Sequence, residues 1–393
     1  MGVFCRKNVT KPLDKYGLEW YNRCEYKSGG VSLTDKIEEN TVEEAKTAKG
    51  NKTLKVLRII TAGLLAVFII LAGTVAGVVL AMREIGKSNL ADRREDPDRY
   101  DDYVYDPDVI RFNGETYRYN KDLTNFLFLG IDNKELGNPE HEYAGGGFSD
   151  VILLGVLDEK NAKLTVLQID RNTVVPVKAY DGEGASLGTS DTQIARAYSY
   201  GDGKEKSVEL SIAAVSELLF GVPVNGYYVL AMPAVATVND MVGGVTVTLE
   251  HDMKLDKKEY KAGTVLKLMG EETELYLRAR IGVGDETNAS RIARQQEYMR
   301  LFIEQARNKM LGDFSLVGEI YNTVMASSCT DVTATEAVYL ATEIFGYTIE
   351  FRSIAGETVY GSSEESEENS DMFYPDSDEL YRTVIDIFYI KEG

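Results

Sequence analysis

The chain has 393 residues, with 43 Lys and Arg against 63 Asp and Glu, which gives a net charge of −20 at pH 7. A field of that sign repels phosphate backbones and argues against general nucleic-acid binding. The chain has only two His and three Cys, and the cysteines show no metal-binding or redox spacing, so a His-based triad or a zinc site is nearly excluded. Chemistry must therefore depend on carboxylates, arginines or a bound metal.

An uncharged stretch of 24 residues, IITAGLLAVFIILAGTVAGVVLAM, occupies 59–82. A helix of that length spans roughly 36 Å, which is enough to cross a hydrocarbon core of ~30 Å. A buried core helix is a weaker interpretation, because core helices are shorter and carry polar positions. A cleaved signal peptide also fits poorly, since the stretch is too long and begins too far into the chain.

The charges that flank this stretch predict its direction. The residues that precede it are basic, with no acid among them: Lys46, Lys49, Lys52, Lys55 and Arg58. Such an excess keeps the preceding segment in the cytoplasm and places the larger remainder outside the cell. We therefore predict a cytoplasmic tail over 1–58, a membrane helix over 59–82, a spacer over 83–122 and an extracellular domain over 123–393, with an acidic loop over 361–379.

Hydrophobic periodicity predicts the elements of the outer domain. Short apolar runs at 125–131, 151–157 and 163–169 are typical of buried strands, and the turn at 158–161 makes the last two a β-hairpin. Further strands are expected at 226–230 and 245–249, and helices at 207–220, 233–241, 290–310, 335–345 and 380–389. Alternating strands and helices predict an α/β fold, an αβα sandwich with a mixed central sheet, preceded by one transmembrane helix.

Two acidic residues stand where strands meet loops. Asp132 follows the first predicted strand in FLGID, and Asp150 precedes the second in FSDVILL. If these strands are neighbours, both carboxylates converge on one edge of the sheet. Such a pair suits Mg²⁺, which takes few protein ligands and completes its shell with water and phosphate. The alternative is that both aspartates only cap loops.

Arginines are the second feature of an otherwise acid-rich domain. Arg171 ends the predicted hairpin, and Arg278 and Arg280 lie in YLRAR, where they share a face if the segment is extended and diverge if it is helical. Arg291 and Arg294 fall in the first turn of a helix, where cations oppose the helix dipole and a bound anion would relieve the conflict. The arginines therefore form either an anion site or ordinary surface salt bridges.

Several motifs, taken in order, resemble the LytR-CpsA-Psr family of cell-envelope proteins. They are FLFLGID, SDVILLGVL, LQIDRNT, QIARAYSYGDG, AVSELLFGVPVNGYYVL, MVGGVTVTL, YLRAR and SRIARQQ. The resemblance implies an αβα fold with an apolar pocket for a polyprenyl chain. It implies a phosphotransferase that moves a glycopolymer from a polyprenyl pyrophosphate carrier onto a peptidoglycan acceptor through a phosphodiester, assisted by Mg²⁺ at a membrane.

The resemblance also implies site residues. Asp132 and Asp150 match metal-associated aspartates, and Asp150 is our choice as the base. The residues that match pyrophosphate-contacting or site-lining positions are Arg171, Arg278, Arg280, Arg291, Arg294 and Gln295, and the catalytic set is Asp150, Arg171, Arg278 and Arg280.

The chain also departs from the family pattern at two places. Phe148 replaces a basic residue, and Asp170-Arg171-Asn172 replaces Pro-Arg-Asp. These departures would fit one alternative, a non-catalytic protein that binds lipid-linked polymer. An older label of the family keeps a second alternative open, a cell-envelope regulator of the transcriptional attenuator type.

Overall fold

The computed structural model describes residues 33–95, 109–133, 136, 146–279, 283–284, 286–325, 327–363 and 366–392. The chain divides into two units, 1–74 and 75–393, and each is considered by itself. Helix α1 (Leu33–Glu95) contains a segment, Thr61–Glu95, that is long and apolar enough to cross a membrane. The apolar stretch predicted from the sequence is therefore helical.

A mixed six-stranded sheet forms the centre of the second unit. Its strands run in the order β13 (Ser328–Thr330), β8 (Gly226–Ala231), β3 (Leu123–Ile131), β4 (Ser149–Asp158), β5 (Lys163–Ile169) and β14 (Thr348–Ser353). Strand β3 is parallel to β8 and antiparallel to β4, and β4 is antiparallel to β5. The predicted hairpin and the mixed sheet are confirmed.

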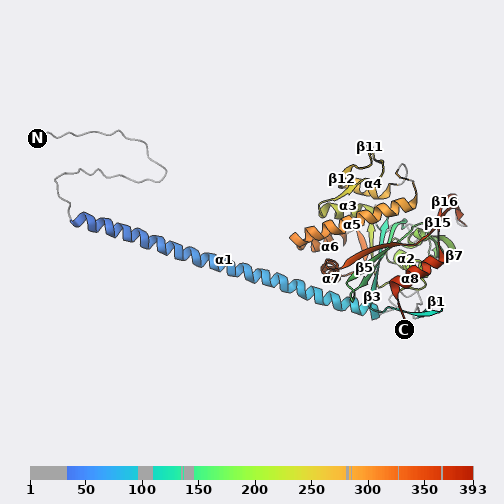
Figure 1. Cartoon of the computed structure of the whole chain (residues 1–393), viewed down its shortest axis with the longest axis horizontal. Helices are drawn as coiled ribbons and strands as arrows, with labels where there is room; N and C mark the ends of the chain where they lie inside the picture. Colours follow the sequence, from blue (N-terminus) through green and yellow to red (C-terminus); the bar gives the residue numbers. More distant parts are fainter. Residues whose placement is uncertain are drawn as a thin grey trace. The chain divides into compact units, whose positions relative to one another are not determined.

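Helices cover both faces of this sheet, as Figure 1 shows for α2 and α8 on one side and α3 and α5 on the other. The helices of this unit are α2 (Glu205–Leu218), α3 (Met232–Met241), α4 (Glu271–Arg278), α5 (Asn288–Gly312), α6 (Ser315–Met325), α7 (Ala334–Ile344) and α8 (Ser377–Phe388), with 3₁₀ turns η1 (Ile194–Arg196) and η2 (Tyr198–Tyr200). The predicted αβα sandwich is therefore confirmed.

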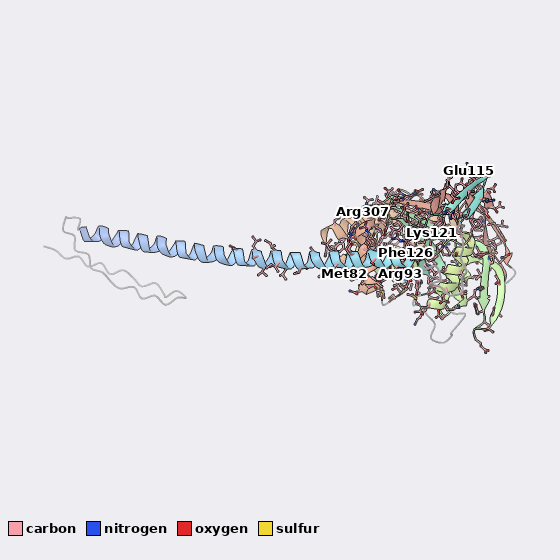
Figure 2. The ribbon with its side chains drawn as sticks, turned by 90° about the horizontal axis from the view of Figure 1, so that it is seen from below. Met82, Arg93, Glu115, Lys121, Phe126 and Arg307 are labelled. Atoms are coloured by element: carbon pink, nitrogen blue, oxygen red, sulfur yellow. The ribbon has the colours of Figure 1, made fainter. Side chains whose placement is uncertain are left out.

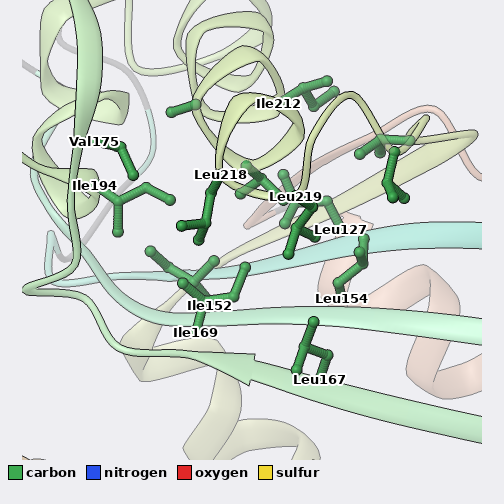
Figure 3. Close-up of a cluster of buried hydrophobic side chains, with 14 of the residues drawn as sticks. Leu127, Ile152, Leu154, Leu167, Ile169, Val175, Ile194, Ile212, Leu218 and Leu219 are labelled. Carbon is green, nitrogen blue, oxygen red and sulfur yellow. The ribbon is translucent and has the colours of Figure 1, made fainter. Parts of the chain in front are cut away.

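Alternation along the strands builds the core beneath α2. Ile152 and Leu154 of β4 point to the same face as Leu167 of β5, and all three side chains are almost fully buried. Figure 3 shows Ile152 below Leu218, with Leu154 and Leu167 farther along the sheet, and all of them belong to one buried cluster with Leu218 and Leu219 of α2 and its C-terminal end. Burying a side chain of this size stabilises the fold by roughly 1.5–3 kcal/mol.

The remaining strands form small sheets outside the centre. They are β1 (Val109–Phe112), β2 (Glu115–Tyr119) and β17 (Tyr389–Lys391) in one sheet, and the pairs β6 (Val174–Tyr180) with β7 (Ser186–Gln193), β9 (Val245–Thr248) with β12 (Val265–Leu268), β10 (Met253–Leu255) with β11 (Lys258–Tyr260), and β15 (Gly356–Ser363) with β16 (Ser366–Pro375). Strand β9 pairs with β12 and not with the central sheet. Two glycines with positive φ, at 243 and 244, turn the chain just before it.

Two predicted segments differ from the structure. The loop expected over 361–379 is mostly the second half of the β15–β16 hairpin, followed by the start of α8. The spacer expected over 83–122 contains the end of α1 and strands β1 and β2, while 96–108 lie outside the described residues. Both segments are rich in charge, which suggested exposed chain, but backbone pairing and helix packing do not need an apolar sequence.

The end of α1 packs against the folded domain. Leu90 is completely buried in a cluster with Phe126 of β3 and Tyr339 of α7. Arg93 forms an ion pair with Glu336, at 2.6 Å between Nε and Oε1, and the two side chains are 4% and 1% exposed. Figure 2 shows Arg93 and Phe126 at this junction, with Met82 farther back along the helix.

The Glu336 ion pair predicts how stability depends on pH. Burial raises the pKa of Glu336, but hydrogen bonds from Arg93 and from the Thr333 backbone lower it more, so this pKa lies below its ordinary value of 4.5. A lowered pKa stabilises the fold above pH 4.5, and this stabilisation is lost as the pH falls through the folded-state value. We expect Glu336→Gln to lose about 3–5 kcal/mol of unfolding free energy at pH 7, and the difference from the parent to shrink below pH 4.5.

Chemical denaturation of the full chain in detergent at pH 7 and pH 3.5 measures both quantities. The matched control is Glu343→Gln, which removes a partner of Arg83 that is 21% exposed, against 1% for Glu336, and should cost no more than about 1 kcal/mol. If both variants lose the same unfolding free energy at pH 7, the Arg93–Glu336 pair does not stabilise the fold more than the Arg83–Glu343 pair.

Candidate functional site

A β-bulge directs Asp150 toward the edge of the sheet. Val151 pairs with Gly130 and Ser149 pairs with Ile131, so Asp150 lies between two paired positions with no partner of its own across the ladder. Bulges of this kind re-aim a side chain and are common beside active sites. The carboxylate of Asp150 is 9% exposed.

Two of the predicted arginines meet at this carboxylate. Arg171, just beyond the end of β5, contacts Oδ1 of Asp150 through Nη1. Arg278, the last residue of α4, places Nε 3.6 Å from Oδ2, and its Nη1 donates to Glu274 at 3.2 Å. The helical alternative for YLRAR holds as far as Arg278, and Arg280 lies outside the described residues. Two cations from different elements therefore hold one nearly buried anion.

Asp132 lies at the same edge of the sheet, as the predicted strand pairing requires. Its Oδ1 accepts a hydrogen bond of 2.8 Å from the backbone N–H of Phe148, and its own N–H donates to the Phe148 carbonyl. Gly147 has φ +77°, and a side chain there would collide with Asp132. Asp132 thus closes the loop before β4, which is the loop-capping role that the sequence left open.

Phe148, the apparent departure from the family pattern, lies between two arginines. The guanidinium carbons of Arg171 and Arg196 lie 5.9 and 5.8 Å from the centre of its ring. A cation over an aromatic face is attracted by the ring quadrupole. Arg196, at the end of η1, was not among the predicted site residues, although the motif QIARAYSYGDG contained it. A third guanidinium therefore lies close to the Asp150 cluster.

Arg294 and Gln295 do not join this cluster. Arg294 donates through Nε to the Tyr276 carbonyl at 3.0 Å, contacts the Ala279 carbonyl through Nη2, and lies over the Tyr276 ring. Gln295 accepts from Gln168 of β5 at 2.8 Å and donates to the Leu277 carbonyl. These contacts fasten α5 to α4 and to the sheet, so both residues hold the elements that carry Arg278.

Burial also affects the charge of Arg294. Because the side chain is buried beside carbonyls and an aromatic ring, desolvation lowers its pKa, and Tyr276 offsets this only in part. Arg291 is half-buried in the first turn of α5. The N-terminus of this helix is capped by Thr287, whose side chain accepts from the N–H of Ser290.

Asp170 shapes the turn that carries Arg171, a role that the sequence does not predict. Its buried carboxylate accepts from the N–H of Asn172 at 2.8 Å and from the side chain of Asn288 at the start of α5. Its carbonyl accepts from the N–H of Thr173 at 2.9 Å. The turn that carries Arg171 is therefore shaped by Asp170. The sequence signal for this role is a carboxylate next to a predicted site arginine. From the sequence alone, Asp170 is only a departure from the family pattern.

Asp132 and Asp150 are two hard oxygen donors at this edge in the part of the chain that the structure describes. Among the described residues, no three His, Cys, Asp or Glu side chains gather as a metal-binding group. Two carboxylates fit Mg²⁺ when substrate phosphates and water supply the other ligands. The donor chemistry of Asp132 and Asp150 thus fits Mg²⁺ in the presence of a phosphorylated substrate, with the arginines as competitors for Asp150.

Known proteins share this sequence pattern and fold. The model of the LytR_cpsA_psr family matches residues 87–384. TagU of Bacillus cereus, a polyisoprenyl-teichoic acid–peptidoglycan teichoic acid transferase, is 28% identical over 207 residues, which are 53% of this chain and 60% of TagU. TagT of Bacillus subtilis, a transferase of the same name, is 26% identical over 299 residues, which are 73% of this chain and 80% of TagT.

Solved structures agree with the architecture. The crystal structure of B. subtilis TagV has a TM-score of 0.52 at 25% identity and covers 68% of this chain and 97% of that chain. A Streptococcus agalactiae protein has a TM-score of 0.55 at 19% identity, covering 68% of this chain and 86% of its own, and shares the fold. The chain spans 60% of TagU and 57% of the curated B. subtilis TagV sequence. With a family model that matches most of its length, the chain belongs to the LytR-CpsA-Psr family.

Proposed function

We propose that this chain is a membrane-anchored transferase that moves a glycopolymer from a polyprenyl pyrophosphate carrier onto peptidoglycan. The relatives TagU and TagT have names that describe teichoic acid transfer to peptidoglycan. The observation that carries the proposal is the pair of guanidinium groups from Arg171 and Arg278 that converge on Asp150 at the sheet edge. Clustered guanidinium groups bind phosphate oxygens through charge-assisted, bidentate hydrogen bonds.

A phosphate group of the substrate can replace the carboxylate of Asp150 as the anion that Arg171 and Arg278 bind. The side chains of Arg171 and Arg278 are 23% and 45% exposed, so an entering pyrophosphate can reach them. Within the described part of the chain, Nε of Arg171 is buried without a hydrogen-bond partner. That donor can be satisfied by a phosphate oxygen. When the pyrophosphate takes over the arginines, the carboxylate of Asp150 is released for chemistry.

The reaction then follows as a phosphoryl transfer. A sugar hydroxyl of peptidoglycan attacks the phosphorus that bears the polymer, and its proton passes to the carboxylate of Asp150. The bond from that phosphorus to the bridging oxygen breaks, and polyprenyl phosphate leaves. Arg171 and Arg278 stabilise the charge that accumulates on the leaving phosphate. The product is a phosphodiester between polymer and peptidoglycan.

A metal ion fits the same scheme. Mg²⁺ would neutralise phosphate charge during the transfer, and Asp132 and Asp150 are the carboxylates that would hold it. The two residues contribute differently, since Asp132 is fixed by the Phe148 amide whereas Asp150 contacts the arginines.

An open apolar surface supports a lipid substrate. Phe128 lies in the centre of β3, yet its side chain is 40% exposed although helices cover this face elsewhere. The ring of Tyr228 lies 6.4 Å away in a stacked arrangement, and the Phe128 ring lies so close to Gly155 that a side chain there would crowd it. Phe128 is four residues from Asp132, which is roughly 13 Å along a strand. A polyprenyl chain on this surface would place its pyrophosphate near the carboxylates.

We expect Asp150→Asn to abolish transfer while the fold survives. Losing the proton acceptor should reduce the rate about 100-fold or more. The amide keeps the size of the side chain, so the stability loss should stay at about 1–3 kcal/mol. The measurements are transfer of lipid-linked polymer to peptidoglycan, with and without Mg²⁺, and the melting temperature.

Unchanged transfer in this variant would remove Asp150 from the mechanism. A parent protein that binds the carrier but transfers nothing would instead support the non-catalytic binding protein, which Phe148 and Asn172 had kept open.

The arginines should divide into two groups. Arg278→Ala removes a half-exposed side chain at the anion cluster, so we expect carrier binding to weaken about tenfold to a hundredfold with little change in melting temperature. Arg294→Ala removes buried contacts to two carbonyls and should mainly lower the melting temperature. Arg382→Ala is the matched control, because within the described residues the exposed side chain of Arg382 pairs with exposed Glu379 on α8.

Calorimetry with polyprenyl pyrophosphate in detergent, at a temperature where every variant is folded, separates these effects. Full-strength binding by Arg278→Ala would make Arg278 a surface ion-pair partner and place the site elsewhere.

The topology is tested separately. The basic flank before 59–82 predicts that the N-terminus stays in the cytoplasm. Protease added to intact protoplasts should digest the domain that contains Asp150 and leave an N-terminal tag protected. Digestion of the tag with survival of the domain would reverse the orientation and exclude an extracellular reaction.

A further inference from the structure

The helix that carries the apolar stretch ends inside the folded domain. Residues 75–82, the last turns of that stretch, belong to the same unit and the same helix as residues 83–95. Leu90 is completely buried, and Gly86 lies so close to α7 that a side chain there would collide with the Thr335 carbonyl. The helix is therefore an integral part of the domain at this end.

Arg93 is the centre of this junction. Its guanidinium makes a bidentate contact with Glu336, at 2.6 Å from Nε and 2.9 Å from Nη2. Nη1 donates to Asp331 at 2.6 Å and to the carbonyl of Asn225 at 3.1 Å. One buried side chain thus joins α1 to the start of α7, to the segment before it and to the start of β8.

Weaker ion pairs surround the junction. Arg83 contacts Glu343 at 2.6 Å, and Arg94 lies 3.5 Å from Glu159 in the β4–β5 turn. Partly exposed pairs of this kind contribute little to stability. They nevertheless reach two further elements, so the last three turns of α1 are fastened on several sides.

Strand β3 connects this junction with the site. Phe126 belongs to the same buried cluster as Leu90. Phe128, two residues later, lies on the same face and is exposed, and Asp132 follows the end of the strand. The distance from Phe126 to Asp132 along an extended strand is roughly 20 Å. The strand that meets the membrane helix at one end therefore leads to the candidate site at the other.

We propose that Arg93 is a positioning residue, which locks the extracellular end of the membrane helix to the domain so that β3 is held at one height and orientation above the bilayer. This proposal rests on the proposed function for its purpose, because a polyprenyl carrier must be taken from that bilayer. A domain on a flexible spacer would sample many orientations, whereas a clamped domain keeps one orientation relative to the end of the helix.

The test uses the full chain in lipid vesicles, with its cysteines replaced and a single donor dye at Leu187→Cys, an exposed position in β7. Energy transfer to acceptor dyes on the lipid headgroups measures the distribution of distances between domain and membrane. Four proteins are compared: the parent, Arg93→Met/Glu336→Leu, a Gly-Ser-Gly-Ser insertion between Met82 and Arg83, and a seven-residue Ala-rich helical insertion at the same point.

We expect a narrow distribution for the parent and a broad one for the flexible insertion, which leaves the Arg93 contacts intact and so should fold normally. The helical insertion should keep the distribution narrow but shift it by about 10 Å. The double variant removes both partners of the buried pair and should broaden the distribution. Transfer from a vesicle-embedded carrier should fall about tenfold or more in the flexible variant, while transfer from a short-chain, water-soluble pyrophosphate should be unchanged.

A broad distribution in the parent, an unchanged narrow distribution in Arg93→Met/Glu336→Leu, or no broadening by the flexible insertion would overturn the proposal. The distance measurement needs no substrate, so it stands apart from the proposed function. A parent with a narrow distribution that transfers polymer from neither substrate would refute the transferase and leave the clamp supported.

Discussion

Burying a carboxylate is unfavourable unless cations and hydrogen bonds compensate for the lost water, and this constraint at Asp150 organises the candidate site. The bulge in β4 places this side chain where only 9% of it is exposed. Compensation comes from Arg171 beyond β5 and from Arg278 on α4. Helix α4 must therefore be held over the sheet edge, and the contacts of Arg294 and Gln295 hold it there. Residues that never reach the cluster thus determine whether it forms.

Much of the architecture was predictable because the central strands are buried on both faces. Runs such as FLFLGI and VILLGVL have no other stable environment than a covered sheet, and the short turn between 157 and 163 allows only a hairpin. The β6–β7 and β15–β16 hairpins were not predicted. Strands β7, β15 and β16 are rich in Ser, Thr, Gly, Asp and Glu and carry no apolar alternation. Strand β6 does alternate, with Val175, Val177 and Ala179 buried, but Pro176 in its middle weakens the strand signal. Pairing partners far apart in sequence, such as Phe373 with Asn172, leave no local signal at all.

The motifs indicated candidate residues for the site, but not the contacts that each one makes. Arg171 and Arg278 meet at Asp150, yet a long side chain on a helix can turn toward the site or back toward its neighbours. Arg294 turns back, because the carbonyls at the end of α4 need donors. Asp170 shows the reverse case. A departure from the family pattern suggested a weakened site, whereas in three dimensions the carboxylate shapes the turn of Arg171.

The Arg93–Glu336 and Arg171–Asp150 pairs have different roles, and their solvent exposure explains the difference. Arg93 and Glu336 are 4% and 1% exposed, and the guanidinium nitrogens of Arg93 all have protein partners. Such a pair has nothing left to offer a ligand and acts as a fixed joint. Arg171 is 23% exposed, and its Nε has no hydrogen-bond partner within the described residues. Because Arg171 is partly exposed at the sheet edge, we propose that a substrate anion replaces the carboxylate of Asp150 there while the fold is kept. The same chemistry is therefore structural at the end of α1 and, in the proposed function, exchangeable at the candidate site, and the degree of solvent exposure makes the difference.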